Sequence, residues 1–226
     1  MKQVKVITAQ EAALLVKDND VVASNGFVGS VQPEALTSAL EARFLETGAP
    51  RDLTLIYAAS QGNSDGRGGD HFAHEGMLKK AILGHWNAVT ALQKLVNANK
   101  IQAYNLPQGT LAQYFRDVAA HRVGTITHVG LETFADPRVS GGRLNDVTTE
   151  DFVKVIQIDG KDQLFYPRMD INVALIRGTY ADEWGNVVLT KEIAPLDATS
   201  IAQAAHNSGG TVIVQVEKIV KGGMMH

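Results

Sequence analysis

The sequence predicts an α/β fold: an open, mostly parallel sheet with helices on both faces and a small antiparallel hairpin insertion. Short β-branched runs alternate along the chain with longer segments whose apolar residues recur every three or four positions. The run LTLIYAAS, residues 53–60, is continuously apolar, which is typical of a strand buried on both faces of a parallel sheet. An Asp-Gly pair between two strand-like runs within residues 149–168 is typical of a hairpin. This alternation is the pattern of α/β proteins.

The first third of the chain is predicted to contain two strands and two helices before residue 53. The runs VKVIT (4–8) and DVVAS (20–24) are rich in β-branched residues, and residues 10–17 between them have helical spacing. The segment 33–47 is predicted to be an amphipathic helix. A proline at its first position and a glycine after its last are typical of the two ends of a helix.

The later elements follow the same rhythm and complete a single domain over residues 1–226, without an internal repeat. Strands are short apolar runs and helices have apolar residues at a spacing of three or four. The predicted strands are 53–60, 101–107, 127–131, 173–178 and 211–220, and the predicted helices are 74–83, 109–121 and 199–209.

Composition excludes several classes of function. The 226 residues are 45% apolar and carry a net charge of −3, which gives no indication of a nucleic-acid or membrane partner. The absence of cysteine excludes a disulfide framework, a thiol nucleophile and a Cys-ligated zinc site. No apolar run reaches the ~18 residues of a membrane span, so a cytoplasmic protein is expected.

Four polar or glycine-rich loops follow predicted strands, and they are the candidate ligand-binding segments. In parallel sheets, ligands bind at the carboxyl ends of the strands. We therefore expect these loops to meet at one edge of the sheet: residues 24–30, 60–69, 107–110 and 132–145.

The first of these loops, Asn-Gly-Phe-Val-Gly at 25–29, has two glycines where a turn between strand and helix needs one at most. Such a loop can present backbone N–H groups to an anion, although an ordinary strained turn explains the spacing equally. No Gly-Lys-Ser/Thr follows, and the glycines do not complete G-x-G-x-x-G, so neither a P-loop nor a dinucleotide fingerprint is present.

Other clusters favour plain structural roles. His71, His74 and Glu75 would share a face if their segment were helical, and such spacing can bind a metal, but a polar cluster at a helix start is commoner, so no metal is predicted. GNSDGRGGD, with Arg67, resembles a phosphate cradle but lacks the Lys-Ser/Thr, which favours a glycine-rich loop. The GHW at 84–86 could line a pocket or the core, and residues 136–138 (DPR) are expected to form a turn with an internal ion pair.

Five stretches resemble a known family. DNDVVASNGFVGSVQPEAL is similar to the N-terminal signature of the family I coenzyme A transferases, with agreement at five positions and departures at three. The positions that agree are Asp18, Asn19, Gly26, Phe27 and Pro33, and those that depart are Ser24, Asn25 and Val31. The stretches that resemble the propionate or acetate branch, whose two halves are fused, are YAASQGNSDGRGGDHFAHEGMLKKAILGHW, AYNLPQGTLAQYFRD, ETFADPRVSGGRLND and ALIRGTYADEWGN. The resemblance runs from about Thr8 to the C-terminus.

This resemblance implies transfer of coenzyme A between an acyl-CoA and a short-chain carboxylic acid through a glutamyl-CoA thioester. Coenzyme A is then a substrate and no cofactor is needed. In the family, backbone N–H groups of the glycine loop stabilise the oxyanion, and a glutamine in a Pro-Gln-Gly turn lies beside the catalytic glutamate. The corresponding catalytic residues are Asn25, Gly26, Phe27, Val28, Gly29 and Gln108, and we expect substrate contacts at Gln61, Gly62, Asn63 and Gly109.

The resemblance places the nucleophilic glutamate in a second half beyond residue 226, and neither Glu75 nor Glu132 lies in a matching motif. We therefore expect residues 1–226 to be the N-terminal domain, inactive alone, with the C-terminal half as partner and a homo-oligomer as the assembly. Two alternatives stay open: an isomerase of the sugar-phosphate type, and a non-catalytic ligand-binding or partner domain of similar fold.

Overall fold

A six-stranded parallel sheet forms the centre of the molecule in the computed structural model, which describes residues 3–222. Its order is β11-β8-β1-β2-β3-β4, and every neighbouring pair is parallel. The carboxyl ends of these strands therefore lie at the same edge. In this order the strands span Thr211–Gln215, Val173–Arg177, Val21–Ser24, Leu53–Tyr57, Leu78–Leu83 and Gln102–Asn105.

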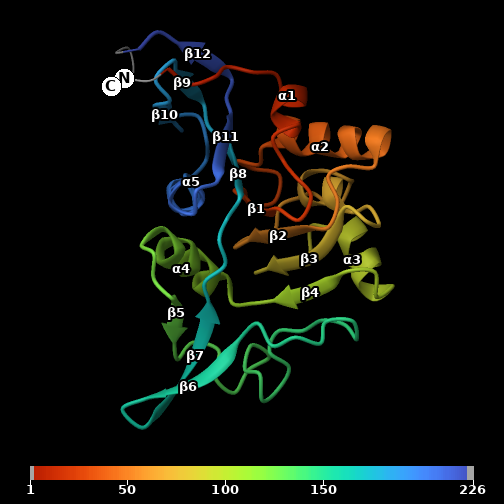
Figure 1. The fold of residues 1–226 in the computed structure, drawn as a ribbon, viewed down its shortest axis with the longest axis vertical. Helices are drawn as coiled ribbons and strands as arrows, with labels where there is room; N and C mark the ends of the chain where they lie inside the picture. Colours follow the sequence, from red (N-terminus) through yellow and green to blue (C-terminus); the bar gives the residue numbers. More distant parts are fainter. Residues whose placement is uncertain (1–2, 223–226) are drawn as a thin grey trace.

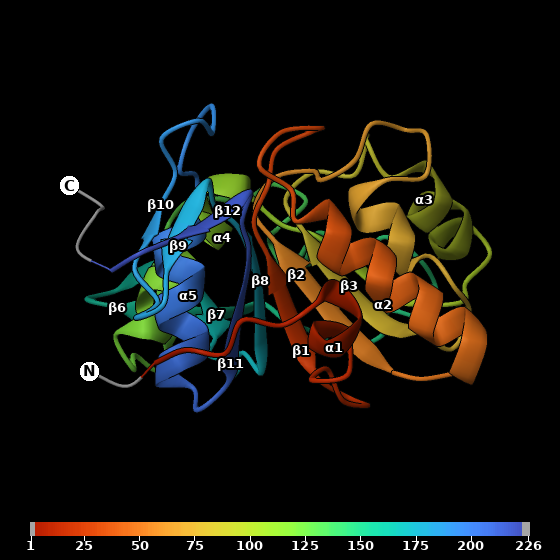
Figure 2. The ribbon, with the colours of Figure 1, turned by 90° about the horizontal axis from the view of Figure 1, so that it is seen from above.

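Helices cover both faces of this sheet, as predicted (Figures 1 and 2). One face is covered by α1 (Ala9–Ala13), α2 (Glu34–Thr47), the 3-10 turn η1 (Gly68–Phe72) and α3 (Thr90–Asn97). The other face is covered by α4 (Gln108–Ala119) and α5 (Ala198–Asn207). Alternation along the strands separates the two cores: in β2, Leu55 packs into the first and Ile56 into the second.

Two small three-stranded sheets flank the central sheet. One has the order β5-β7-β6 and is antiparallel, and the other has the order β10-β9-β12. Their strands are β5 (Gly124–Thr127), β6 (Lys154–Ile158), β7 (Lys161–Pro167), β9 (Tyr180–Asp182), β10 (Val187–Val188) and β12 (Lys218–Val220). The predicted hairpin is confirmed, because Asp159 and Gly160 join β6 to β7 with φ of 51° and 72°.

The helix at 33–47 is confirmed at both ends. Pro33 is the residue before the first helical position of α2, and Gly48 ends the helix in the left-handed conformation with φ of 71°. Helix α2 therefore starts directly after the glycine loop and is anchored in the first core through Leu40 and Phe44. None of the helices in the described part of the chain combines the length and hydropathy needed to cross a bilayer.

The helix predicted at 74–83 is wrong, because its second half is strand β3. This strand pairs with β2 on one side and β4 on the other, and Ala81 and Ile82 are buried on opposite faces of the sheet. Pairing on both sides outweighs the helical spacing of LKKAIL, since intrinsic propensity is a weak determinant beside tertiary burial.

Four further expectations need correction. Residues 4–8 form no strand, since Thr8 instead closes a capping box with Glu11 at the start of α1, which ends earlier than residue 17. The strand predicted at 127–131 lies earlier, at 124–127, where β7 pairs with it. The run 211–220 is two strands, because the chain leaves β8 after Gln215 and then pairs with β9.

Candidate active site

The loops after β1 and β2 are joined to each other at the carboxyl edge of the sheet. The Val28 N–H donates to the Ser60 carbonyl oxygen at 2.6 Å, and the Gly62 N–H donates to the Val28 carbonyl oxygen at 3.0 Å. The expected meeting of residues 24–30 with residues 60–69 is therefore confirmed. Both loops lie at the upper edge of Figure 2.

The turn after β4 joins the same edge, and the fourth predicted loop reaches it at Gly142, whose carbonyl oxygen accepts from the N–H of Asn105, the last residue of β4, at 2.7 Å. Gly84, which follows β3, packs so closely between the Ala58 carbonyl and the Gln108 backbone that a Cβ there would lie 2.9 Å from Gln108 Cα. Gln108 therefore stands beside the ends of β2 and β3. From Gly142 the chain continues antiparallel along β4, away from this edge, and the Leu144 N–H donates to the Ala103 carbonyl oxygen at 3.0 Å.

A segment that sequence reasoning missed lies behind the glycine loop. Asn25 is buried, and its amide group donates to the Pro195 carbonyl oxygen at 3.4 Å and accepts from the Asp197 N–H at 3.1 Å. These two hydrogen bonds anchor the glycine loop to the segment between β10 and α5, which lies at the upper edge of Figure 2. The contact spans about 170 residues of sequence, and no local signal announces it.

Three of the five amides predicted to form an oxyanion hole are already hydrogen-bonded. They donate to carbonyl oxygens as follows: Asn25 to Leu175 at 3.1 Å, Phe27 to Ser30 at 2.9 Å and Val28 to Ser60 at 2.6 Å. These three bonds shape the loop, so those amides are not free to stabilise an oxyanion, and the prediction is corrected for Asn25, Phe27 and Val28.

The backbone amides of the two glycines in this loop are not hydrogen-bonded among the described residues. Within residues 3–222, neither the Gly26 nor the Gly29 N–H has an acceptor. Gly26 is buried and has φ of 156°, a conformation that side-chain-bearing residues rarely adopt, and a Cβ there would lie 3.1 Å from Gln32 and Gln61. Gly29 is exposed, with no atom within 4 Å of a Cβ position. The Gly29 amide is therefore open to an approaching chemical group, and the Gly26 amide is an unbonded donor in the buried part of the loop.

Gln61 has a different role from the one predicted. Its buried side chain accepts from Ser24 Oγ at 2.8 Å and donates to the Ser24 carbonyl oxygen at 2.8 Å. Since both ends of the amide are occupied, Gln61 joins β1 to the loop after β2 rather than contacting a substrate. Asn63, in contrast, is exposed, and its contact with a substrate stays a prediction.

Gly62 lies where the loop after β2 crosses a neighbouring turn. A Cβ at this position would collide with the Ala88 carbonyl oxygen and lie 3.1 Å from the Arg67 carbonyl oxygen. Both obstacles are backbone atoms, which cannot rotate away. Its role is therefore to permit this close approach.

We expect Gly62→Ala to lower the free energy of unfolding by about 1–3 kcal/mol, the usual cost of overpacking. Urea unfolding followed by circular dichroism measures the change. Asn63→Ala is the matched control, since Asn63 is exposed and should change stability by less than about 0.5 kcal/mol. Equal midpoints for Gly62→Ala and the parent chain would contradict the assigned close approach.

Gln108 and Gly109 lie in the first turn of α4, at the carboxyl edge of the central sheet. Both are exposed, and among the described residues the Gln108 side chain makes no hydrogen bond. The start of a helix carries partial positive charge, which favours a nearby carboxylate. An exposed amide at this place can donate a hydrogen bond to an anion without neutralising it.

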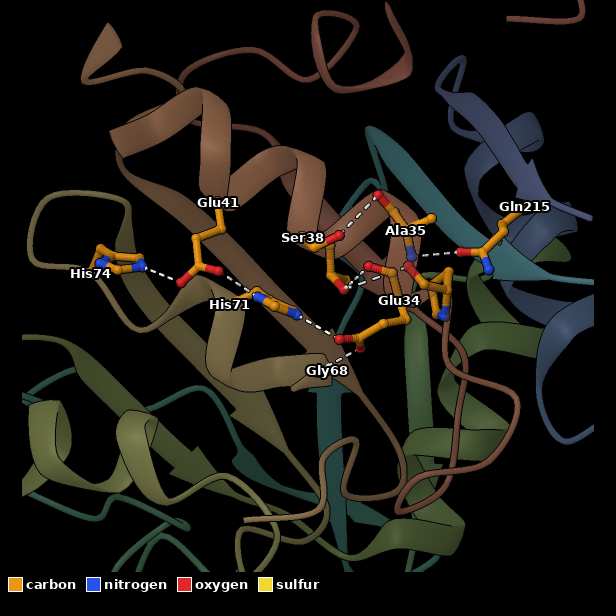
Figure 3. A network of polar contacts seen from close by, with 10 residues as sticks. Glu34, Ala35, Ser38, Glu41, Gly68, His71, His74 and Gln215 are labelled. Carbon is orange, nitrogen blue, oxygen red and sulfur yellow. Dashed lines mark hydrogen bonds and ion pairs between the residues drawn. The ribbon is translucent and has the colours of Figure 1, made fainter. Parts of the chain in front are cut away.

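The polar cluster after the second loop does not have the arrangement expected for a metal site. In the described part of the chain, no group of His, Cys, Asp and Glu side chains is arranged to hold a metal ion. His71 and His74 instead contact Glu41 at 2.6 and 2.7 Å (Figure 3). Glu75 faces away, toward Lys100, just before the amino end of β3. The condition for a shared helix face is not met, because the 3-10 turn η1 ends at Phe72, before His74 and Glu75.

The remaining motifs form an ion pair, a contact with the core and an exposed loop. Arg138 forms the predicted internal ion pair, with Asp136 at 2.7 Å, and this pairing holds the pKa of the Asp136 carboxyl well below its ordinary value. Trp86 packs against the first core and donates to the Tyr104 carbonyl oxygen at 3.3 Å. Arg67 is exposed, on the glycine-rich loop.

Several known proteins are similar to this chain in sequence and in fold. Acetate CoA-transferase YdiF of Escherichia coli K12 is 40% identical over 225 residues, which are 99% of this chain and 42% of the relative. Caffeate CoA-transferase of Acetobacterium woodii is 42% identical over 213 residues, 94% of this chain and 41% of the relative. The crystal structure of YdiF from E. coli O157:H7 as a thioester complex with CoA superimposes with a TM-score of 0.96 at 40% identity, over 99% of this chain and 46% of that chain.

The fold is therefore that of the coenzyme A transferases. A family model described as Coenzyme A transferase matches residues 6–226, and this chain belongs to that family. The chain spans less than half the length of the two curated relatives.

Proposed function

We propose that residues 1–226 are the N-terminal domain of a short-chain acyl-CoA:carboxylate CoA-transferase of the acetate or propionate type. The observation that carries this proposal is the pair of unbonded amides, at Gly26 and Gly29, in a loop whose other amides are all fixed. Similarity to acetate and caffeate CoA-transferases supports the class of reaction. Of the alternatives, neither an isomerase nor a non-catalytic domain is favoured by a feature of this site.

The reaction proceeds by double displacement. A glutamate carboxylate from the second half attacks the acyl-CoA carbonyl carbon, the C–S bond breaks, CoA leaves as the thiolate, and an acyl-glutamyl anhydride remains. The thiolate then attacks the glutamyl carbonyl, the acid leaves as its carboxylate, and a glutamyl-CoA thioester remains. A second carboxylate reverses these steps. Each attack produces an oxyanion, to which the Gly26 and Gly29 amides donate.

Side chains beside these amides suit a small acyl group. Phe27 and Val28 are apolar, yet 49% and 42% exposed, and they lie between the two glycines. They form one side of an acyl pocket whose remaining wall comes from the second half. Asn63 and Gly109, which are exposed on the neighbouring loops, contact the rest of the substrate.

The proposed partners follow from this chemistry. Acyl-CoA and a short-chain carboxylic acid are the substrates, no cofactor takes part, and the C-terminal half of the enzyme supplies the glutamate. Homo-oligomer formation and a cytoplasmic location complete the proposal, without a nucleic-acid or membrane partner.

Gln108→Ala, in the complete enzyme, should slow formation of the glutamyl-CoA thioester by roughly 10- to 100-fold. The reason is that a hydrogen bond to a charged group contributes about 1.5–3 kcal/mol, and Gln108 would donate to the glutamate carboxylate. Trapping the thioester by borohydride reduction, or detecting it by mass spectrometry, measures its rate of formation.

Gln113→Ala is the matched control on the same helix. Gln113 donates to Asp117 at 3.1 Å, so its loss should leave the thioester rate within about twofold of the parent. Circular dichroism verifies that both variants are folded. If the thioester accumulates at the parent rate in Gln108→Ala, Gln108 is a turn residue and has no part in the reaction.

A further inference from the structure

His71 is held between two carboxylates of helix α2. Its Nδ1 lies 2.6 Å from Glu41 Oε2, and its Nε2 lies 2.8 Å from Glu34 Oε1 (Figure 3). Ionised carboxylates only accept hydrogen bonds, so both ring nitrogens must donate to satisfy this geometry. With both carboxylates ionised, the geometry therefore requires a doubly protonated imidazolium, and His71 is only 8% exposed.

The same carboxylates reach the candidate active site. Glu34 Oε2 accepts from the Gly68 N–H at 3.0 Å, and the adjacent Gly69 N–H donates to the Gln61 carbonyl oxygen at 2.7 Å. Gly62, the next residue, donates to Val28 in the glycine loop. An uninterrupted series of hydrogen bonds and chain links thus connects His71 to the loop that contains Gly26.

Charged groups face His71 from two elements. Glu34 and Glu41 come from α2, and Asp70 neighbours His71 on η1, where it accepts the Ala91 and Leu92 N–H groups of α3. Beyond Glu41 lies His74, which binds the other carboxylate oxygen at 2.7 Å. Among the described residues, helix α3 donates to Asp70 through these two backbone N–H groups, and the charged groups in contact with His71 are carboxylates.

The protonation of His71 follows from these neighbours. Burial disfavours the charged ring and by itself would lower the pKa of His71, but the hydrogen bonds to Glu34 and Glu41 outweigh burial and raise that pKa. Glu41 responds in the opposite direction: burial raises its pKa, but the contacts with His74 and His71 prevail and lower it. Both shifts favour the ion pair near neutral pH.

We propose that His71 is a positioning residue for the transfer reaction: as an imidazolium between Glu34 and Glu41, it fixes residues 60–69 against α2 and so keeps the glycine loop in its reactive arrangement. This rests on the proposed function. Because the folded-state pKa of His71 is raised, the stabilisation is present below the ordinary histidine pKa while the two carboxylates stay ionised, and it is lost as the pH rises through the raised pKa. The reaction should lose rate over the same range.

The test compares His71→Gln with His74→Gln in the complete enzyme, by hydrogen–deuterium exchange of the peptide that covers residues 61–70 and by the pH profile of kcat. Gln can donate to one carboxylate only, so His71→Gln should lose exchange protection in this peptide and about tenfold or more in kcat at pH 7, since small displacements at a site are costly. The pH profile of kcat for His71→Gln should lack the fall at alkaline pH that the parent enzyme shows. His74→Gln should keep both parent values within about twofold.

A milder variant, Glu41→Gln, keeps an acceptor but removes one charge. The alkaline loss of protection and of kcat should then move to lower pH by about one unit or more, because a neighbouring opposite charge shifts a pKa by about 1–3 units. Parent-like protection in His71→Gln, or reduced protection with unchanged kcat, overturns the positioning role. Exchange is measured without substrate, so a failure of the proposed reaction leaves this readout intact and the two failures can be distinguished.

Discussion

Gly26→Val in the complete enzyme is expected to lower kcat by ~10²–10³-fold, the usual effect of losing one oxyanion donor. A side chain at Gly26 meets Gln32 and Gln61 at 3.1 Å in a backbone conformation, φ of 156°, that valine resists. The peptide must therefore turn, and its N–H no longer points to where the oxyanion develops. Because this donor acts mainly in the transition state, KM should change far less than kcat. Steady-state kinetics with propionyl-CoA and acetate measures both.

Gly124→Val is the matched control for this substitution. Gly124 has the same φ of 156° and abuts the Tyr166 carbonyl, but it lies in β5, outside the glycine loop. It should reduce stability, measured by urea unfolding, without the large loss of kcat. A folded Gly26→Val enzyme with parent kcat, or equal losses of kcat in both variants, would remove the loop from the mechanism.

Much of the fold could be predicted because local signals and burial agreed. Helix α2 begins after a proline and ends at a left-handed glycine, and the Asp159-Gly160 turn joins β6 to β7. The errors arose where partners far along the chain decide. Residues 78–83 have helical spacing but pair with strands on both sides. Residues 4–8 have β-branched composition, but they meet the end of β9 through the bond from the Val4 N–H to the Glu183 carbonyl oxygen, which is too little for a ladder.

The sequence predicts which loops form the candidate site, but not which hydrogen bonds those loops make. That the loops after β1 and β2 meet follows from parallel topology, and the resemblance identified the glycine loop. Which amides remain unbonded does not follow, because Val28 is taken up by Ser60 and Asn25 by Leu175. The same limit explains the revised role of Gln61, whose partner, Ser24, is 37 residues away.

In the proposed reaction this chain contributes the oxyanion loop, and the nucleophile comes from a second half. Glu75 lies at the opposite, amino edge of the sheet, and Glu34, the carboxylate next to the loop in sequence, is bound by Gly68 and His71. These contacts leave neither carboxylate placed to attack at the glycine loop.

The most direct test is an assay of CoA transfer from propionyl-CoA to acetate by purified residues 1–226, with and without a separately produced second half that carries the glutamate. We expect no turnover above background from the chain alone, and turnover together with a trappable glutamyl-CoA thioester when the second half is added. Measurable turnover by residues 1–226 alone would contradict the account, as would a folded, assembled complex of both halves that forms no thioester.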